Sequence, residues 1–235
     1  MKIFEIENLN LTPKQVKTKQ GVLEPYVEPK EWPKKGTELL GKGVTAFAIT
    51  KGSKPHEVRR ITFDSMHPRF DPYIRFLKIA IKHQDNPFFP KIYLVKIFKK
   101  SGIHQSRGKY FYYTELERLS SWEKLSWAQW SQLYNQYFGT SLRDAQMSDA
   151  SKSGVAHDFS LRLAELIKDP RQQRWGSRLH IKNIDDKNLK QAVNALKLSL
   201  GGSELIRLDL HKDNVMYRFT PYGTQPVITD PFYYS

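Results

Sequence analysis

The sequence predicts an α+β fold in which strands dominate the first half of the chain and helices the second half. Short stretches of alternating apolar and polar residues, typical of strands, lie between residues 39 and 63. Apolar residues recur at helical spacing between residues 126 and 200, and a hairpin pattern then covers 215–228. A chain of 235 residues can bury one substantial core, so we expect one domain.

The first strands are expected after an N-terminal arm. Residues 1–35 carry prolines among lysines and predict an extended arm, which is either mobile or laid on the lobe that the following strands form. Residues 39–49 then show a strand, a glycine-rich turn and a second strand, with Gly41 and Gly43 in the turn. Lacking a Cβ, these glycines allow backbone N–H groups to approach a phosphate, although the same pattern also fits a plain hairpin turn.

A third strand and a helix follow. Residues 57–63 alternate as a strand does, and Asp71 with Pro72 forms a typical start of a helix. The helix carries an apolar stripe of Ile74, Leu77 and Ile81. It also carries a basic stripe, which predicts a solvated face, of Arg75, Lys78 and Lys82. No glutamate lies between Pro72 and Gln84.

The second half of the chain predicts three helices. Before them, residues 109–119 begin as an aromatic strand and end in a charged segment that connects this strand to the helices. Ser126 and Gln129 form a capping-box pattern, and the helix that they start should end at Gly139. Its aromatic residues at helical spacing are expected in the core: Trp127, Trp130, Tyr134 and Tyr137. Residues 143–154 are small and polar and predict a loop.

The other two helices are predicted from their apolar faces. One should begin at Asp158 and stop at Asp169 and Pro170, burying Phe159, Leu163, Leu166 and Ile167. The other should end at Gly201 and Gly202, with Leu189, Val193, Leu196 and Leu200 on one face. The basic, irregular residues 171–186 between them are the expected loop for docking a partner.

Three polar side chains near the C-terminus carry the chemical signal. Asp209 and Asn214 lie on a short loop, and a hairpin over residues 215–228 should bring Asp230 close to them. Phosphoryl transfer uses such a set, in which one carboxylate faces the attacking hydroxyl and an amide and a second carboxylate hold a divalent cation. The alternative is an Asp-capped turn between strands of an unrelated protein.

With these motifs, the chain resembles the eukaryotic-like protein-kinase superfamily. The pattern D-x-H-x-x-N-x-M followed by I-T-D-P is most similar to the small early-gene serine/threonine kinases of lytic tailed phages. The resemblance runs from about Gly36 to the C-terminus and implies a two-lobed protein-kinase-like fold. It implies a β-rich small lobe with a hinge over 36–119 and a reduced, mostly helical large lobe over 120–235, after the basic arm of 1–35.

The resemblance also implies ligands and residue roles. The ligands would be ATP and Mg²⁺. Asp209 matches the catalytic aspartate, with His211 or Lys212 adding positive charge, and Asn214 and Asp230 match the metal ligands. The residues that match ATP-binding positions are Gly41, Lys42, Gly43, Ala46, Arg60, Glu117 and Leu119.

Several positions depart from the kinase pattern. Ala46 replaces the third glycine of the phosphate-covering loop, and Arg60 stands where the phosphate-binding lysine is expected. Arg207 replaces the histidine of H-R-D, and Pro231 with Phe232 replaces Phe-Gly. Because no glutamate follows in the helix after Arg60, the lysine–glutamate ion pair of assembled kinases cannot form here.

The composition of the chain indicates the cellular compartment and the binding partners that we expect. Lysine and arginine number 38 against 24 acidic residues, giving a formal charge of +14 that favours acidic partners. Nucleic acid is a secondary candidate, since no recognition motif accompanies the charge. Cysteine is absent, which excludes disulfides and thiolate metal sites. Neither a signal peptide nor a membrane-spanning run is visible, so we expect a cytoplasmic protein, in the host cytoplasm if it is viral.

The leading expectation is a minimal ATP-dependent protein serine/threonine kinase that acts on host proteins. The alternative is a catalytically weak or inactive kinase-like module that binds and inhibits a host protein. Retention of Asp209, Asn214 and Asp230 favours catalysis, whereas the missing lysine–glutamate pair favours binding. A nucleic-acid-binding protein is the third class. Because only residues 231–235 follow Asp230, we expect the later large-lobe helices to be missing.

Overall fold

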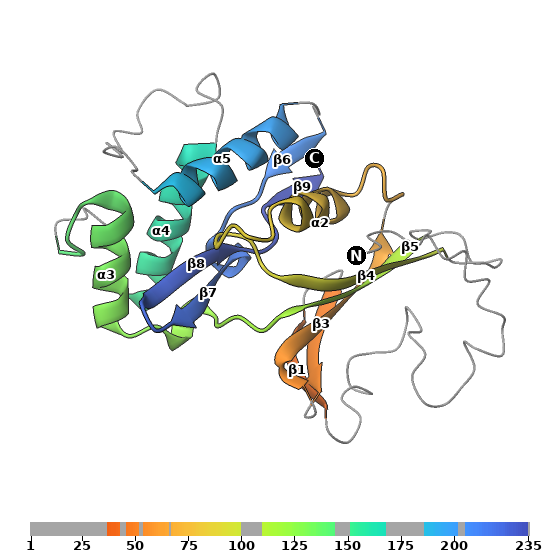
Figure 1. The fold of residues 1–235 in the computed structure, drawn as a ribbon, viewed down its shortest axis with the longest axis horizontal. Coiled ribbons are helices and arrows are strands. Elements are labelled where there is room, and N and C mark those ends of the chain that lie inside the picture. The colour runs from red at the N-terminus through yellow and green to blue at the C-terminus, as the bar shows by residue number, and fades with distance from the viewer. Residues whose placement is uncertain are drawn as a thin grey trace. The chain divides into compact units, whose positions relative to one another are not determined.

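The computed structural model describes residues 37–42, 46–51, 54–65, 67–99, 110–143, 151–167, 186–201 and 205–234 (Figure 1). These residues divide into two compact units, one up to Ile74 together with Lys91–Arg118, and one of Arg75–Pro90 with the chain from Leu119 onward. The first unit is rich in strands and the second is mostly helical. The predicted α+β fold, with strands mostly before the helices, is therefore confirmed. The predictions for residues 1–35, for Gly43 and for 171–185 lie outside the described residues.

One antiparallel sheet forms most of the first unit. Its strands lie in the order β1-β2-β3-β5-β4. Their bounds are Thr37–Lys42 for β1, Ala46–Lys51 for β2, Lys54–Ser65 for β3, Ile92–Lys99 for β4 and Tyr110–Glu117 for β5. The strands predicted around residues 39–49 and 57–63 are thus present as β1, β2 and β3. Ile49 and Ile61 are buried on one face of the sheet, with Leu39 and Tyr113 packed against them.

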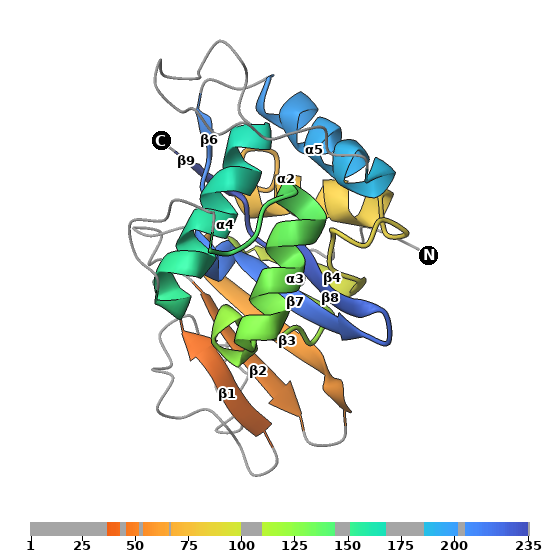
Figure 2. The same ribbon diagram turned by 90° about the vertical axis from the view of Figure 1, so that its left-hand side faces the viewer.

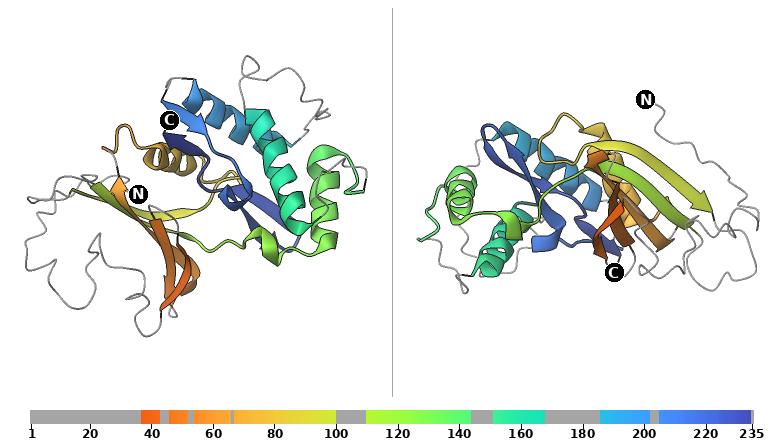
Figure 3. Two further views of the ribbon diagram at one scale, coloured as in Figure 1. Left: turned by 180° about the vertical axis from the view of Figure 1, so that it is seen from behind. Right: turned by 90° about the horizontal axis from the view of Figure 1, so that it is seen from below.

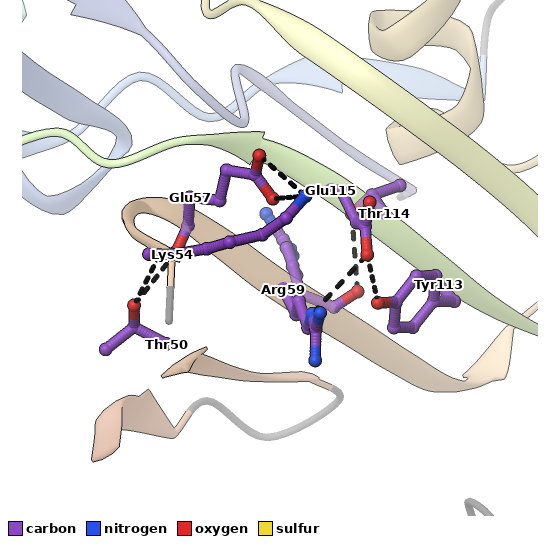
Figure 4. A network of polar contacts seen from close by, with 8 residues as sticks. Thr50, Lys54, Glu57, Arg59, Tyr113, Thr114 and Glu115 are labelled. Atoms are coloured by element: carbon purple, nitrogen blue, oxygen red, sulfur yellow. Dashed lines mark hydrogen bonds and ion pairs between the residues drawn. The ribbon is translucent and has the colours of Figure 1, made fainter. Parts of the chain in front are cut away.

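A polar network on that face joins β3 to β5 (Figure 4). Arg59 lies opposite Glu115, with 3.4 Å between Nε and Oε1, and the hydroxyl of Tyr113 donates to the same carboxylate at 2.5 Å. Burial, together with the neighbouring Glu115, raises the pKa of Tyr113 well above its usual value. The outer end of β3 is held by Lys54, whose ammonium donates to Glu57. The contact between Arg59 and Glu115 stabilises the register of β3 against β5.

Helix α2, Pro72–Lys82, begins in the first unit and continues in the second. Its predicted cap is confirmed, since Asp71 Oδ1 accepts from the backbone N–H groups of Tyr73 (3.0 Å) and Ile74 (3.2 Å). Lys78 and Lys82 are exposed, as predicted for the basic stripe. Arg75 differs, because it is half-buried and its Nε donates to Ser199 Oγ at 2.7 Å. Burial lowers the pKa of Arg75.

Helix α3, Trp127–Phe138, follows the short 3-10 turn η2, Trp122–Lys124. The predicted capping box of Ser126 and Gln129 is present, and Gly139 ends the helix in the left-handed conformation with φ of 61°. Of the aromatic residues that were expected in the core, Trp130, Tyr134 and Tyr137 are buried. The prediction for Trp127 is wrong, because this first residue of the helix points outward and is 47% exposed.

Helix α4, Lys152–Ile167, begins earlier than the predicted start at Asp158. Ser151 caps the helix by accepting the N–H of Gly154 at 3.1 Å, so residues 152–154 are helical and not part of a loop. Phe159, Leu163 and Ile167 are buried as predicted, whereas Leu166 is half-buried.

Helix α5, Lys187–Leu200, ends at Gly201 as predicted. It begins at a side-chain cap, because Asp186 Oδ1 accepts from the N–H groups of Asn188 (2.8 Å) and Leu189 (3.1 Å). Leu189, Val193 and Leu196 are buried on its inner face, and Leu200 is half-buried.

The C-terminal segment forms two small antiparallel sheets. Strand β6, Ile206–Leu208, pairs with β9, Phe232–Tyr234, and β7, Val215–Thr220, forms the predicted hairpin with β8, Gly223–Ile228. The hairpin lies beside α3 (Figures 2 and 3), where Gln129 Nε2 donates to Thr224 Oγ1 at 3.1 Å. Gly223 has φ of 129°, and a Cβ there would lie 2.5 Å from Gln132 Nε2. Only glycine fits this turn without strain.

The hairpin also holds the turn after α2. Ile228 N donates to Phe88 O at 2.9 Å. The guanidinium of Arg218 donates to the carbonyls on either side, at 2.9 Å to Pro87 O and 3.2 Å to Phe89 O. Every carbonyl of residues 87–89 therefore accepts from the hairpin.

An aromatic core joins α3, α4 and β7, with Phe159 at its centre. Its rings are those of Trp130, Tyr134, Tyr137, Phe138, Phe159 and Tyr217. Tyr134 donates to Asp158 Oδ2 at 2.7 Å, and Asp158 also pairs with Arg162 at 2.6 Å. Within the described residues, by contrast, the buried hydroxyl of Tyr217 and the indole N–H of Trp130 have no hydrogen-bond partner.

No helix among the described residues has the length and apolar content that crossing a membrane requires.

Tyr134 has a hydrogen-bond partner for its hydroxyl, and Tyr217 has none in the described structure. Replacing each by phenylalanine should therefore have opposite effects on stability. Tyr134→Phe should lower the free energy of unfolding by about 1–3 kcal/mol, because Asp158 loses a donor in a buried setting. Tyr217→Phe should leave the free energy unchanged or raise it, since the removed hydroxyl makes no hydrogen bond in the described structure. Urea unfolding of both variants measures this, and equal losses would contradict it.

The buried tyrosines also predict a loss of stability at alkaline pH. Burial raises the pKa of several phenols above the usual value of 10. The tyrosines with a raised pKa are Tyr112, Tyr113, Tyr134, Tyr137 and Tyr217. A raised native pKa means that the unfolded chain ionises first, so the stabilisation is complete below pH 10 and is lost as the pH rises above it. Each tyrosine should contribute a slope of up to about 1.4 kcal/mol per pH unit.

Urea unfolding at several pH values above 10 tests this expectation. The free energy of unfolding should fall more steeply in the wild type than in Tyr134→Phe, which has one such phenol fewer. Equal slopes in the two proteins would contradict the assignment for Tyr134.

Candidate active site

Two backbone connections bring the loop of Asp209 and the segment of Asp230 together in the second unit. Asp209 follows β6, and its N–H donates to Pro231 O at 2.7 Å. At the other end of the loop, Thr229 donates to Asn214 O through both its N–H (3.0 Å) and its Oγ1 (3.2 Å). Asp230 therefore lies between two residues that are hydrogen-bonded to the two ends of the loop.

The side chain of Asn214 makes a hydrogen bond across the loop to Asp209. Asn214 ends the 3-10 turn η4, Lys212–Asn214, and its Nδ2 donates to Asp209 O at 2.6 Å. This bond fixes which side of the amide carries the oxygen, the group that a cation can bind. Asp230 is half-buried, whereas the side chain of Asp209 is 45% exposed and open to an acceptor.

His211 lies between two carboxylates. Its Nδ1 accepts from Asp213 N at 3.3 Å, and its Nε2 is 3.8 Å from Asp209 Oδ2. Because Nδ1 is an acceptor, a neutral His211 carries its proton on Nε2, on the side of Asp209. His211 can therefore present an N–H group beside the predicted catalytic carboxylate.

Lys212 is engaged by the scaffold of the loop. Its Nζ donates to Ser153 Oγ at 2.6 Å and lies 4.5 Å from the centre of the Trp122 ring. Trp122 in turn donates through Nε1 to Asp213 Oδ1 at 3.0 Å. Trp122 and Ser153 were missed in the sequence because they are far from the loop along the chain and belong to no motif. Thr229 was missed too, and its only signal was its place beside Asp230.

Of the described residues that match ATP-binding positions, all but Leu119 lie in the first unit. Gly41 and Lys42 end β1 and Ala46 begins β2. Cross-strand pairs place Gly41 opposite Ala48, and Ala48 opposite Arg60. Since directly paired residues of antiparallel strands share a face, Arg60 projects from the same face as Ala48 and the opposite face from Arg59.

Arg60 is held by an aromatic ring. Its guanidinium lies 4.0 Å from the ring centre of Tyr73, in the first turn of α2. The Tyr73 hydroxyl is hydrogen-bonded to Thr114 Oγ1 at 3.0 Å, and that oxygen donates to Arg60 O at 3.3 Å. Arg60 is therefore joined to the first turn of α2 by a cation–π contact. The sequence did not indicate Tyr73, because the kinase pattern predicts a carboxylate in this helix as the partner of the cation at position 60.

The hinge residues make structural contacts of their own. Glu117 N donates to Lys91 O at 3.0 Å, and Lys91 N donates to Glu117 Oε1 at 2.8 Å. Leu119 is half-buried and belongs to the second unit.

The donor set is suited to Mg²⁺ bound together with phosphates. Among the described residues no group of three or more His, Cys, Asp or Glu side chains forms a self-contained metal site. Asn214 and Asp230 supply one amide oxygen and one carboxylate, both hard oxygen ligands. Mg²⁺ is commonly bound by one or two carboxylates plus substrate phosphates, so the residues fit this kind of site in their chemistry.

Comparison with known proteins gives no family assignment. No family model matches the chain, and no curated protein matches its sequence. Among solved structures, the GDP and kanamycin complex of APH(2")-IIia is similar over 83% of this chain and 67% of that chain, with 14% identity and a TM-score of 0.32. A TM-score this low carries no argument about fold or activity.

Proposed function

We propose that the protein is an ATP-dependent kinase that transfers a phosphoryl group to serine or threonine hydroxyls of proteins. The observation that carries this proposal is the closed loop of the second unit, in which Asn214 Nδ2 donates to Asp209 O at 2.6 Å. The two neighbours of Asp230 in the chain, Thr229 and Pro231, are hydrogen-bonded to Asn214 and Asp209 at 2.7–3.2 Å. An aspartate and an asparagine on one short loop, next to an aspartate after a hairpin, are the side chains that kinase chemistry requires.

Each residue has a role in this proposal. Asp209 accepts the proton of the acceptor hydroxyl and orients its oxygen, and His211 Nε2 lies 3.8 Å from its Oδ2. Asn214 and Asp230 hold Mg²⁺, which would neutralise charge on the phosphates when bound. In the first unit, Arg60 supplies a cation for the nucleotide phosphates, and Gly41, Lys42 and Ala46 belong to the strands that flank the loop expected to cover them.

A protein acceptor is supported by exposure and charge. The Asp209 side chain is nearly half exposed, so a segment of a large acceptor can reach it. The formal charge of +14 favours acidic protein surfaces, and host proteins of the cytoplasm are the acceptors that we propose.

The second candidate is a kinase-like module that acts by binding a host protein without phosphorylating it. It is favoured by the contact between Arg60 and Tyr73, because a guanidinium stacked on a ring is already engaged in the described structure.

Phosphate transfer from labelled ATP separates the two candidates. The purified chain should label itself or proteins of a host lysate when ATP and Mg²⁺ are supplied, and the label should be recovered as phosphoserine or phosphothreonine. Retained ATP binding without label on any protein would overturn the kinase proposal and favour the binding module.

Arg60 gives a further prediction in the same assay. Arg60→Ala should raise KM for ATP by about tenfold or more, because a cation beside the phosphates is lost. Tyr73→Leu should raise it by a smaller factor, corresponding to about 0.5–2 kcal/mol of lost cation–π energy. Arg59→Ala is the matched control, since Arg59 projects from the opposite face, and it should leave KM within about twofold. An unchanged KM in Arg60→Ala would remove Arg60 from the site.

A further inference from the structure

A groove of about 480 Å³ lies between the end of α2 and one face of α5, within the second unit. The α2 side contributes Lys82 and His83. The α5 side contributes residues at helical spacing, so that they lie on one face, namely Lys187, Lys190, Gln191 and Leu198. None of these residues belongs to the candidate active site.

The groove is strongly cationic. Lys82, Lys187 and Lys190 are all exposed, and no acidic residue lines it. Within the described part of the chain, none of these ammonium groups has an ion-pair partner.

The same face of α5 also offers an apolar contact. Leu198 is 82% exposed, whereas Leu189 and Leu196 of the same helix are fully buried and Leu200 is half-buried. The α5 face therefore has positive charge near its N-terminal end and an apolar side chain near its C-terminal end.

The walls of the groove are held by hydrogen bonds. Asn86, in the turn after α2, donates through Nδ2 to Asn188 O at 2.8 Å and to Gln191 Oε1 at 3.2 Å. Further along, Arg75 Nε donates to Ser199 Oγ at 2.7 Å. A ligand would thus enter a groove whose walls are already positioned, which lowers the entropy cost of binding.

We infer that this groove binds an acidic peptide segment of a partner protein. Carboxylates of the segment pair with Lys82, Lys187 and Lys190, and an apolar side chain packs against Leu198. A peptide fits better than nucleic acid, because an exposed leucine gives nothing to a phosphate backbone and His83 is the only ring in the lining that a base can stack on. The inference does not depend on phosphoryl transfer, since it holds equally for a kinase and for a binding module.

Fluorescence anisotropy with the full chain tests the groove. The probe is a labelled peptide in which aspartates and glutamates flank a leucine, compared with a peptide that has asparagine and glutamine in their place. The acidic peptide should bind at low salt and lose affinity at about 1 M salt, where the Debye length is roughly 3 Å. Equal binding of the neutral peptide would overturn the inference.

Charge-reversed variants locate the binding. Lys187→Glu combined with Lys190→Glu should weaken binding of the acidic peptide by about tenfold or more. Acidic residues in the first turn favour a helix, so this variant should keep α5 folded, and circular dichroism checks that it does. Lys124→Glu, an exposed change outside the groove, should keep the affinity within about twofold. Equal effects of the two charge changes would overturn the inference.

Leu198→Ser separates a peptide from nucleic acid. The variant should weaken peptide binding by about threefold or more, since one apolar contact is lost. Binding of a labelled DNA duplex should not change in this variant. If DNA binds the wild type more tightly than the peptide does and is the ligand lost in the lysine variant, the groove is a nucleic-acid site and the inference is wrong.

Discussion

Asp209→Asn should lower the rate of phosphoryl transfer by about 10²–10⁴-fold, because amide in place of carboxylate cannot accept the hydroxyl proton. The fold should be retained. Asp209 donates its N–H to Pro231 O and accepts from Asn214 Nδ2 at its carbonyl, and both hydrogen bonds use only the backbone of Asp209. Binding of ATP should also remain, so the loss falls on kcat. Single-turnover transfer and calorimetric ATP titration measure these quantities.

Asp213→Asn is the matched control for Asp209→Asn. Asp213 lies on the same loop and is exposed, and Trp122 Nε1 can donate to the amide oxygen as it does to the carboxylate. Its transfer rate should stay within about threefold of the wild type. Equal rates in Asp209→Asn and the wild type would remove Asp209 from its proposed role.

Asp230→Ala should abolish the tightening of ATP binding by Mg²⁺. Asn214 alone offers one neutral oxygen to a hard cation that prefers carboxylates, so the remaining site is too weak to hold Mg²⁺ with the nucleotide. Transfer should fall below detection for the same reason. Calorimetry of ATP binding with and without Mg²⁺ gives the difference directly in the wild type and the variant.

Asp85→Ala serves as the control for Asp230→Ala, because Asp85 is an exposed carboxylate of the same unit in the turn after α2. It should retain the Mg²⁺ dependence of the wild type. The same Mg²⁺ dependence in Asp230→Ala would show that Asp230 is not a metal ligand.

Elements with local signals were predictable from the sequence. The caps at Asp71 and Ser126 and the stop at Gly139 depend on residues within one turn, and the structure has them where the sequence predicted. The start of α4 was misplaced because Ser151 was read as part of a polar loop, although serine is also a helix cap. Trp127 was misassigned because its spacing alone does not tell an inward face from an outward one at a helix end.

Contacts between distant segments were not predictable. Lys212 looked like a cation for the phosphates, but its ammonium is bound to Ser153 and lies over Trp122. Arg60 looked like a cation without a partner, and Tyr73 is the partner that packing provides. In both cases the neighbour is an aromatic ring, which sequence patterns assign by default to the core.

The bonds between the β7–β8 hairpin and residues 87–89 determine how this part of the second unit opens. Ile228 N and Arg218 satisfy three successive carbonyls of the turn, so the turn cannot leave the hairpin without exposing them all at once. We expect the turn, the end of α2 and the hairpin to form one cooperative opening unit in native-state hydrogen exchange. The amide protons of Ile228 and of the final turn of α2 should then exchange with the same opening free energy.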